Sequence, residues 1–486
     1  MPPDRRVVTA APSHYDRVVR ALSGWLGGAA GWHVRLTSNP RAPLIAVVLV
    51  TTLATLIGLW QKSACYDTGW NRDNSEFMFN HTCYSDIAIL YRERGLAQGK
   101  IPYFDTGSYQ VLEYPVLTGA VMYATAWISR HLDSGSLVSH SLTYFDVNVV
   151  LLFLMALLLA WSVLALSGAR RWDALLFAGA PAVVLSGTIN WDLVAVALTG
   201  LSMLAWARKH PWLSGLLLGL GAAAKFYPIV LLGPFLVLAI RSGRFVGFVK
   251  LVVGGFLVWL AVNLPVMIGA PDQWRYFFDY NSGRAADFGS IWFVFLLAGR
   301  EIKDVNHLSL VLFGIGCVLI AVLAFLAPRR PRLAQLAFLV VAAFLIVNKV
   351  YSPQYVLWLL PLAILARPRV RDILIWQAFE VFYWLMVWMY LAGLYAHHEI
   401  GRAYWWAIIA RVLATLWFSG MVVWDMFVPS RDPVRAGGVD DPTGGEFDGV
   451  PDANWRHLFR PGRRIGPSTD AVEPIDASMA RRTLDG

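Results

Sequence analysis

The stretch APLIAVVLVTTLATLIGLW, residues 42–60, decides the fold, because it is the first of a series of long apolar runs and carries no charge. Its length is close to the roughly 20 residues that an α-helix needs to cross a bilayer. The 41 residues before it are too many and too polar for a cleaved signal peptide. We therefore expect the run to remain as a membrane anchor.

The composition of the whole chain agrees with this reading. Of its 486 residues, 57% are hydrophobic and 15% are charged, and the mean hydropathy is +0.52. Soluble domains have about 45–50% apolar and about 25% charged residues. The further apolar runs are 111–129, 144–167, 174–187, 193–207, 212–240, 245–268, 308–326, 333–347, 355–366, 373–395 and 405–428. They predict an all-α polytopic membrane protein with roughly twelve transmembrane helices.

Short basic loops orient the chain in the membrane. Residues 241–244, 327–332 and 367–372 contain two or three arginines each and should face the cytoplasm under the positive-inside rule. Two long polar segments then face outward. They are a first outer loop, residues 61–110, which we expect to contain short interfacial helices, and a second, residues 270–307.

Both termini are predicted to be cytoplasmic. Residues 1–41 form a basic arm, and residues 429–486 are rich in Gly, Pro, Asp and Arg without apolar periodicity, so we expect a disordered tail. The net charge of +9 is divided among short clusters. No basic domain remains to bind nucleic acid.

Two runs leave the topology open. If the basic segments 169–173 and 207–210 are also cytoplasmic, residues 111–129 dip into the membrane and return, and residues 212–240 form two short helices with Lys225 at their outer tip. If both runs are single spans, two basic loops lie outside and Lys225 lies near mid-membrane, at a cost in free energy. That cost favours the first arrangement.

Three cysteines occur in the chain. Cys65 and Cys83 bracket a polar segment of the first outer loop, where a disulfide is chemically permitted if the loop is extracytoplasmic. Two free thiols are the alternative. Cys317 lies in an apolar run and should pack as a small hydrophobic side chain.

Ionisable residues at the ends of apolar runs are informative, because charge in a bilayer costs free energy unless it is paired or functional. On the predicted outer side, ionisable residues and a few neighbouring polar ones gather in six segments. They are Asp86, Arg92, Glu93, Arg94, Lys100, Asp105 and Glu113; Asn190 and Asp192; Lys225; Arg275, Asp279, Asn281 and Arg284; Lys349, Tyr351 and Gln354; and His397, His398, Glu399 and Arg402. This mixture predicts a site for an amphipathic, anionic, lipid-linked ligand.

Simpler explanations stand beside this one. Asp86 could be present simply because an acidic residue is favoured in the first turn of a helix. Lys225 could extend its ammonium to the interface. His397 and His398 are adjacent, so on a helix they would point about 100° apart, and we expect no metal site. The charged triplet 92–94 is expected to face solvent or lipid headgroups.

Five segments carry a resemblance to a known class of enzyme. They are GLAQGKIPYFD (residues 95–105), LEYPVLTG (112–119), NWDLVAVAL (190–198), GLLLGLGAAAKFYPIVLL (215–232) and NKVYSPQYVLWLLPL (348–362). Together they resemble the GT-C class of membrane glycosyltransferases, and most closely glycosyltransferase family 87, which contains polyprenyl-phosphate-mannose-dependent alpha-mannosyltransferases. The likeness covers residues 60–365 and implies a GT-C bundle in residues 42–428.

The resemblance implies an inverting transfer in which an acid of the first outer loop takes the proton of the acceptor hydroxyl. It assigns this general base to Asp86. The cations that could hold the leaving lipid phosphate are Lys225, Lys349, Arg284, Arg402 and His398. The residues that could orient the sugar or the acceptor are Glu113, Tyr114, Asn190, Asp192, Tyr351 and Gln354. No cofactor is expected.

The expected reaction moves a sugar, mannose in the first place, from a polyprenyl-phosphate carrier to a glycolipid or polysaccharide of the cell envelope, at the extracytoplasmic face of the plasma membrane. Arabinofuranose from its own carrier is the nearest variant. A flippase of lipid-linked sugars should instead show paired ionisable groups near mid-membrane and a repeat of its halves, and the sequence shows neither. A scaffold would leave the outer charges without a role.

Overall fold

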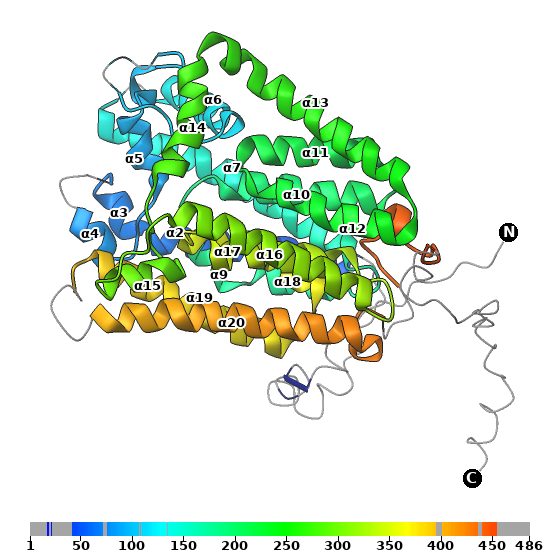
Figure 1. Cartoon of the computed structure of the whole chain (residues 1–486). Coiled ribbons are helices and arrows are strands. Elements are labelled where there is room, and N and C mark those ends of the chain that lie inside the picture. Colours follow the sequence, from blue (N-terminus) through cyan, green and yellow to red (C-terminus); the bar gives the residue numbers. More distant parts are fainter. Residues whose placement is uncertain are drawn as a thin grey trace, which may run out of the picture.

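The computed structural model of the chain describes residues 17–18, 21, 41–70, 75–105, 107, 109–133, 135–394, 401–435 and 440–453. Within these residues, every regular element is an α-helix or a 3₁₀-helix (Figure 1). Six of the described helices are long and apolar enough to cross a membrane. They are α2 (Ala42–Gln61), α7 (Leu137–Leu166), α13 (Phe245–Gly269), α16 (Val305–Leu326), α19 (Val370–Leu391) and α20 (Gly401–Phe427).

Five shorter apolar helices complete the bundle. They are α10 (Asp192–Ala207), α11 (Pro211–Ala224), α12 (Leu232–Ser242), α17 (Leu333–Val347) and α18 (Val356–Ala366). Every residue of α18 and most residues of α10 and α17 are buried, so these helices form the core. The all-helical membrane fold is therefore as predicted, whereas the predicted count of roughly twelve spans is not confirmed.

The remaining elements are short or lie at the ends of the bundle. They are α3 (Ser63–Asp67), α4 (Ser75–Asn80), α5 (Asp86–Glu93), η3 (Leu96–Gln98), α6 (Val116–Leu132), η4 (Arg171–Ala174), α8 (Leu175–Ala178), α9 (Pro181–Ser186), η5 (Tyr227–Leu231), α14 (Pro271–Gly283), α15 (Ile291–Leu297), η6 (Pro353–Tyr355), η8 (Pro429–Arg431) and η10 (Gly445–Phe447).

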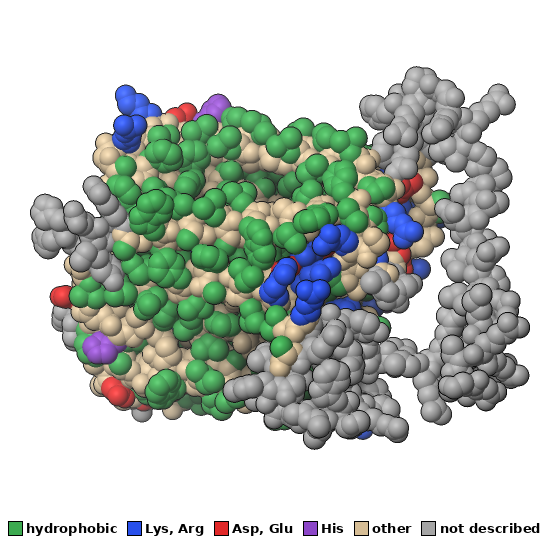
Figure 2. All heavy atoms as spheres, turned by 90° about the horizontal axis from the view of Figure 1, so that it is seen from below, with side chains coloured by type: hydrophobic (Ala, Val, Ile, Leu, Met, Phe, Trp, Pro, Cys, Tyr) green, Lys and Arg blue, Asp and Glu red, His purple; other side chains and the backbone are tan. Residues whose placement is uncertain are grey.

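The surface of the bundle is largely apolar. Helices α13 and α16 expose large hydrophobic side chains, among them Phe256 and Leu310. Figure 2 shows hydrophobic side chains spread over most of the face seen from below, with a cluster of basic side chains right of its centre and other charged side chains near its left and right ends. An exposed apolar surface of this extent is typical of a protein that is surrounded by lipid.

Glycines bring α11 and α13 into close contact. A Cβ on Gly215 would lie 2.1 Å from the Leu251 carbonyl oxygen, and one on Gly219 would lie 2.2 Å from that of Gly255. Small residues at a helix interface let the backbones approach closely, as in other membrane bundles. This packing fixes the C-terminal end of α11, where Lys225 follows.

The two runs of open topology differ in structure. Residues 212–240 are divided at Lys225 into α11 and the η5–α12 helix, as the favoured arrangement predicts. Residues 116–132 do not dip and turn back but form one helix, α6. The Arg130 guanidinium of α6 donates to the Leu96 carbonyl oxygen of the first outer loop, 2.6 Å away, so both ends of α6 lie beside that loop.

The segment after α20 corrects the prediction of a disordered tail for residues 429–435 and 440–453, whereas the rest of the predicted tail lies outside the described residues. Residues 429–435 and 440–453 pack against the basic loops at the end of the bundle opposite α4 and α5 (Figure 1). The Arg332 Nε donates to Asp432 Oδ2 at 2.8 Å, and the Trp206 indole donates to a tail carbonyl. A buried guanidinium needs such partners, because an unpaired buried charge is strongly destabilising.

Candidate active site

A cavity of about 760 Å³ lies between elements that are far apart in the sequence. It is bounded by α4, α5, the segment before α6, the turn at Lys225, α14, the loop from α17 to η6, and the last turns of α19. Of the twelve residues to which the sequence assigns a role in the reaction, eight line it. These are Asp86, Glu113, Tyr114, Asn190, Lys225, Arg284, Lys349 and Gln354.

Asp86 begins α5 and also faces the cavity. The Ser85 hydroxyl caps the helix by accepting from the Ile87 N–H at 3.3 Å, so the simple role of a helix start is fulfilled as well. The Asp86 carboxylate accepts two further hydrogen bonds, from the Tyr84 hydroxyl at 2.5 Å and from the Tyr114 hydroxyl at 3.2 Å. These two phenols fix the orientation of the carboxylate.

Burial raises the pKa of the Asp86 carboxyl above its ordinary value, although the Tyr84 hydrogen bond and the Lys225 charge act in the opposite direction. A higher pKa makes the carboxylate a stronger base. Burial also raises the pKa of Tyr84 and of Tyr114 well above the usual value, so both phenols keep their protons and act as donors.

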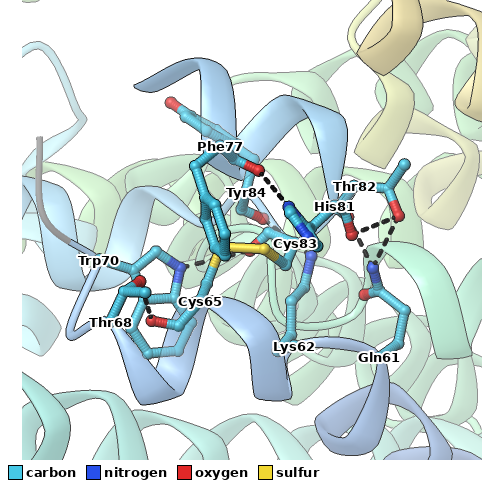
Figure 3. The surroundings of a disulfide bond; sticks show 10 residues. All are labelled: Gln61, Lys62, Cys65, Thr68, Trp70, Phe77, His81, Thr82, Cys83 and Tyr84. Atoms are coloured by element: carbon cyan, nitrogen blue, oxygen red, sulfur yellow. Dashed lines mark hydrogen bonds between the residues drawn. A yellow bond between two sulfur atoms is a disulfide. The ribbon is translucent and has the colours of Figure 1, made fainter. Parts of the chain in front are cut away.

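The segment before Asp86 is fixed by contacts with α3 and with the residue that follows α2. Cys65 and Cys83, which are 18 residues apart, are joined by a disulfide (Figure 3). The Lys62 ammonium is buried beside this bond and donates to the Tyr84 carbonyl oxygen at 2.8 Å. Burial lowers the pKa of Lys62 to about 7. These contacts fix the backbone directly before Asp86.

Lys225 is a paired cation at the cavity wall. Its ammonium lies 2.9 Å from Asp192 Oδ1 and 4.5 Å from the centre of the Tyr114 ring. Lys225 lies at the turn between α11 and η5 and is paired with Asp192. A lysine that only extends its ammonium to the membrane interface would not need such a partner. Lys225 and Asp86 both touch Tyr114, so the acid and the cation share one side of the cavity.

Two further cations line the cavity on neighbouring loops. The Arg284 Nε donates to Asp287 Oδ2 at 2.6 Å, and the Lys349 ammonium donates to the Ser282 carbonyl oxygen at 3.2 Å and to the Asn306 side chain. Burial and, after it, the charge of Arg284 lower the pKa of Lys349. Two positive charges that repel each other in this way favour an anion between them.

The charged triplet 92–94 is placed differently from the prediction. Glu93 and Arg94 line the cavity and do not form a solvated face. The Arg94 guanidinium donates two hydrogen bonds, each 2.9 Å long, to the two carboxylate oxygens of Glu113. The triplet looked solvated in the sequence because nothing local indicates this partner, which follows 19 residues later.

Four predicted residues are not brought to the cavity wall or cannot be placed there. Asp192 lies behind Lys225, and Tyr351 is fully buried against Arg411, so neither lines the cavity. His398 lies outside the described residues, and the Arg402 side chain is outside the described part as well.

Several residues that line or support the cavity were not predicted from the sequence. Tyr84 could have been found, since a phenol two residues before the proposed base can reach it. Arg411 and Glu380 lie inside apolar runs, where charge is costly, whereas the prediction rested on charges at the ends of these runs. Lys62 gave no local signal, because it follows the first span as an interfacial lysine would.

A protein-family model matches the middle of the chain. The family model for glycosyltransferase family 87 matches residues 112–348, which include Glu113, Lys225 and Arg284. Asp86 and Lys349 lie outside the matched residues, on either side. No curated protein matches the chain. Residues 112–348 of the chain thus match glycosyltransferase family 87, and this match indicates a glycosyltransferase with a helical, membrane-type fold.

Proposed function

We propose that the protein transfers a sugar, mannose in the first place, from a polyprenyl-phosphate carrier to a glycolipid or polysaccharide of the cell envelope, with inversion at the anomeric carbon. The observation that carries this proposal is the cavity itself. It combines a hydrogen-bonded carboxylate, Asp86, with three cations, Lys225, Arg284 and Lys349. A neutral sugar with an anionic, membrane-bound leaving group fits this combination.

Asp86 acts as the general base. The acceptor hydroxyl oxygen forms a bond to the anomeric carbon while its proton moves to Asp86, and the bond from that carbon to the phosphate oxygen breaks. The leaving polyprenyl phosphate keeps the electron pair. Positioned bases of this kind contribute roughly 10²–10⁴-fold to the rate. Tyr84 and Tyr114 hold the carboxylate so that a lone pair remains for the acceptor.

The three cations act on the leaving group. Negative charge grows on the departing phosphate oxygen, and fixed positive donors in a site with little water stabilise that charge best. Lys225 lies nearest to Asp86, through Tyr114, and Arg284 and Lys349 lie together on adjacent loops. Asp192 and Asp287 orient two of these cations by direct ion pairs.

Two observations support an extracytoplasmic site in the plasma membrane. The disulfide between Cys65 and Cys83 lies at the cavity end, and disulfides persist in oxidising compartments. The arginine-rich loops lie at the other end, and the positive-inside rule assigns such loops to the cytoplasm. In this orientation both termini are cytoplasmic.

The experiment is transfer of labelled sugar by purified protein in detergent or liposomes. Polyprenyl-phosphate-mannose and polyprenyl-phosphate-arabinose are offered as separate donors with native membrane glycolipids. Transfer of mannose supports the proposal. Transfer of arabinose alone would replace mannose with arabinose as the proposed donor sugar. No transfer from either donor, together with movement of lipid-linked sugar across vesicles, would replace the proposal with a flippase.

A further inference from the structure

Two loops carry Arg284 and Lys349 to the cavity, and their backbones are joined. The Asp287 N–H donates to the Lys349 carbonyl oxygen at 2.8 Å. The Tyr351 N–H donates to the Phe288 carbonyl oxygen at 3.2 Å. Movement of one loop therefore moves the other, and with it the second cation.

Arg411 of α20 lies directly beneath these loops. Its guanidinium donates to the Tyr351 carbonyl oxygen at 2.6 Å and to the Ser352 carbonyl oxygen at 3.3 Å. The Arg411 Nε donates to Glu380 Oε2 of α19 at 2.8 Å. The guanidinium is fully buried and does not line the cavity, so it cannot touch a substrate held there.

Aromatic rings fix the plane of this guanidinium. It lies 3.5 Å from the centre of the Tyr351 ring and 4.2 Å from that of Tyr383. Cation–π contacts of this kind gain strength when water is excluded. A planar fork with five donors can serve two carbonyls and a carboxylate at once, which a lysine cannot do.

The loop that carries Arg284 also contacts α20. The Gly289 N–H donates to the Tyr404 hydroxyl at 3.0 Å, and Gly289 has φ +77°. A Cβ at this position would lie 2.1 Å from the Tyr351 carbonyl oxygen, the atom that accepts from Arg411. Arg411 and Gly289 thus meet at one carbonyl group, with one loop on each side of it.

We propose that Arg411 is a positioning residue that holds both loops and thereby sets the distance between the Arg284 and Lys349 charges for the phosphate of the lipid carrier. This inference rests on the proposed function, since it concerns the leaving-group side of the same site. Arg411 acts through the Tyr351 and Ser352 carbonyls and not by contact with the carrier.

The chain contains a matched control at the opposite end of the bundle. Arg332 is also buried, its Nε donates to Asp432 at 2.8 Å, and it donates to two consecutive carbonyl oxygens, those of Leu365 and Ala366, at 2.7 and 2.6 Å. When each arginine is changed to methionine, both therefore lose a carboxylate partner and hydrogen bonds to two consecutive carbonyl oxygens, and Arg411 also loses its contacts with the Tyr351 and Tyr383 rings. Only Arg411 lies beneath the loops of the cavity.

The test compares wild type, Arg411→Met, Arg411→Lys and Arg332→Met as full-length proteins below their unfolding temperatures. The measurements are kcat and KM for the carrier-linked sugar, and the inhibition constant of the polyprenyl phosphate product, which reports phosphate binding without catalysis. A displacement of about 1 Å can cost on the order of 100-fold in rate. We expect Arg411→Met to lose kcat/KM on that order and to raise the inhibition constant, Arg411→Lys to fall between, and Arg332→Met to match wild type in both.

Equal inhibition constants for Arg411→Met and wild type, or equal changes in Arg411→Met and Arg332→Met, overturn the positioning role. If Arg411→Met does not fold, the same comparison is decided by Arg411→Lys, which keeps a charge beside Glu380. If wild type neither transfers the sugar nor is inhibited by polyprenyl phosphate, the proposed function is wrong, and the positioning role for a phosphate site is rejected with it.

Discussion

Two phenols contact the Asp86 carboxylate. Tyr84 and Tyr114 both donate to it, and the Tyr84 bond is the shorter, at 2.5 Å against 3.2 Å. Burial raises the pKa of Asp86, and the Tyr84 bond offsets part of this increase. Since the ionised carboxylate is the form that accepts a proton, activity should be lost as the pH falls through this raised pKa.

The Tyr84→Phe variant should shift the acid limb of the pH profile. Removing a hydrogen bond that lowers the Asp86 pKa raises that pKa further, so the fall of kcat/KM on the acid side begins at a higher pH than in wild type. Tyr66→Phe is the control, because Tyr66 donates to Asp146, which does not line the cavity. An acid limb of Tyr84→Phe that stays in place, or shifts to lower pH, would contradict this assignment.

Individual residues differ in how far the sequence could predict them. Lys225 was predicted at a turn because a charge at mid-membrane is costly, and the structure breaks the helix there. Arg94 was assigned to solvent because its partner, Glu113, is not adjacent in the sequence. Arg411 lies inside the apolar run 405–428, where a charged residue indicates a buried partner.

At the scale of helices, the apolar runs predict where helices form but not how they pack. The dip predicted for residues 111–129 is instead the single helix α6, and both ends of this helix lie beside the first outer loop. Hydropathy cannot separate these cases, since both place the same side chains in lipid. The glycines of α11 were visible in the sequence, but their contact with α13 was not.

Gly219→Ala and Gly233→Ala should change stability in opposite directions. Alanine in a helix is favoured over glycine by roughly 1 kcal/mol. A Cβ on Gly233 of α12 meets nothing within 4 Å, so this variant should be neutral or slightly stabilised. A Cβ on Gly219 would lie 2.2 Å from the Gly255 carbonyl oxygen, so α11 and α13 must separate, at a cost of roughly 1–3 kcal/mol. Thermal unfolding measures both, and equal Tm values would refute the close contact.

At the scale of the whole molecule, the two ends of the bundle differ in chemistry. The cavity end carries acids and cations around an open volume, whereas the other end pairs its arginines with the segment after α20. The composition of residues 429–453 predicted disorder, because it contains few apolar residues. Its order depends on buried guanidinium groups that are distant in the sequence, such as Arg332 and Arg241.

Asp432→Asn should destabilise the fold without changing the reaction. It removes the carboxylate partner of buried Arg332, and breaking a buried ion pair costs roughly 3–5 kcal/mol. Asp440→Asn is the control, because Asp440 is 45% exposed and its pair with Arg435 should contribute about 1 kcal/mol or less. We expect a lower Tm for Asp432→Asn alone, with the KM for the donor unchanged. A changed KM would indicate coupling between the two ends.

The central assignment is that Asp86 takes the proton of the acceptor. It is tested most directly by the kcat of sugar transfer in Asp86→Asn, with Asp146→Asn as the control, since Asp146 also accepts from a tyrosine but does not line the cavity. We expect Asp86→Asn to lose about 10²–10⁴-fold in kcat while it still binds the donor, and Asp146→Asn to retain wild-type kcat. A kcat of Asp86→Asn equal to that of wild type would contradict the assignment of Asp86 as the base.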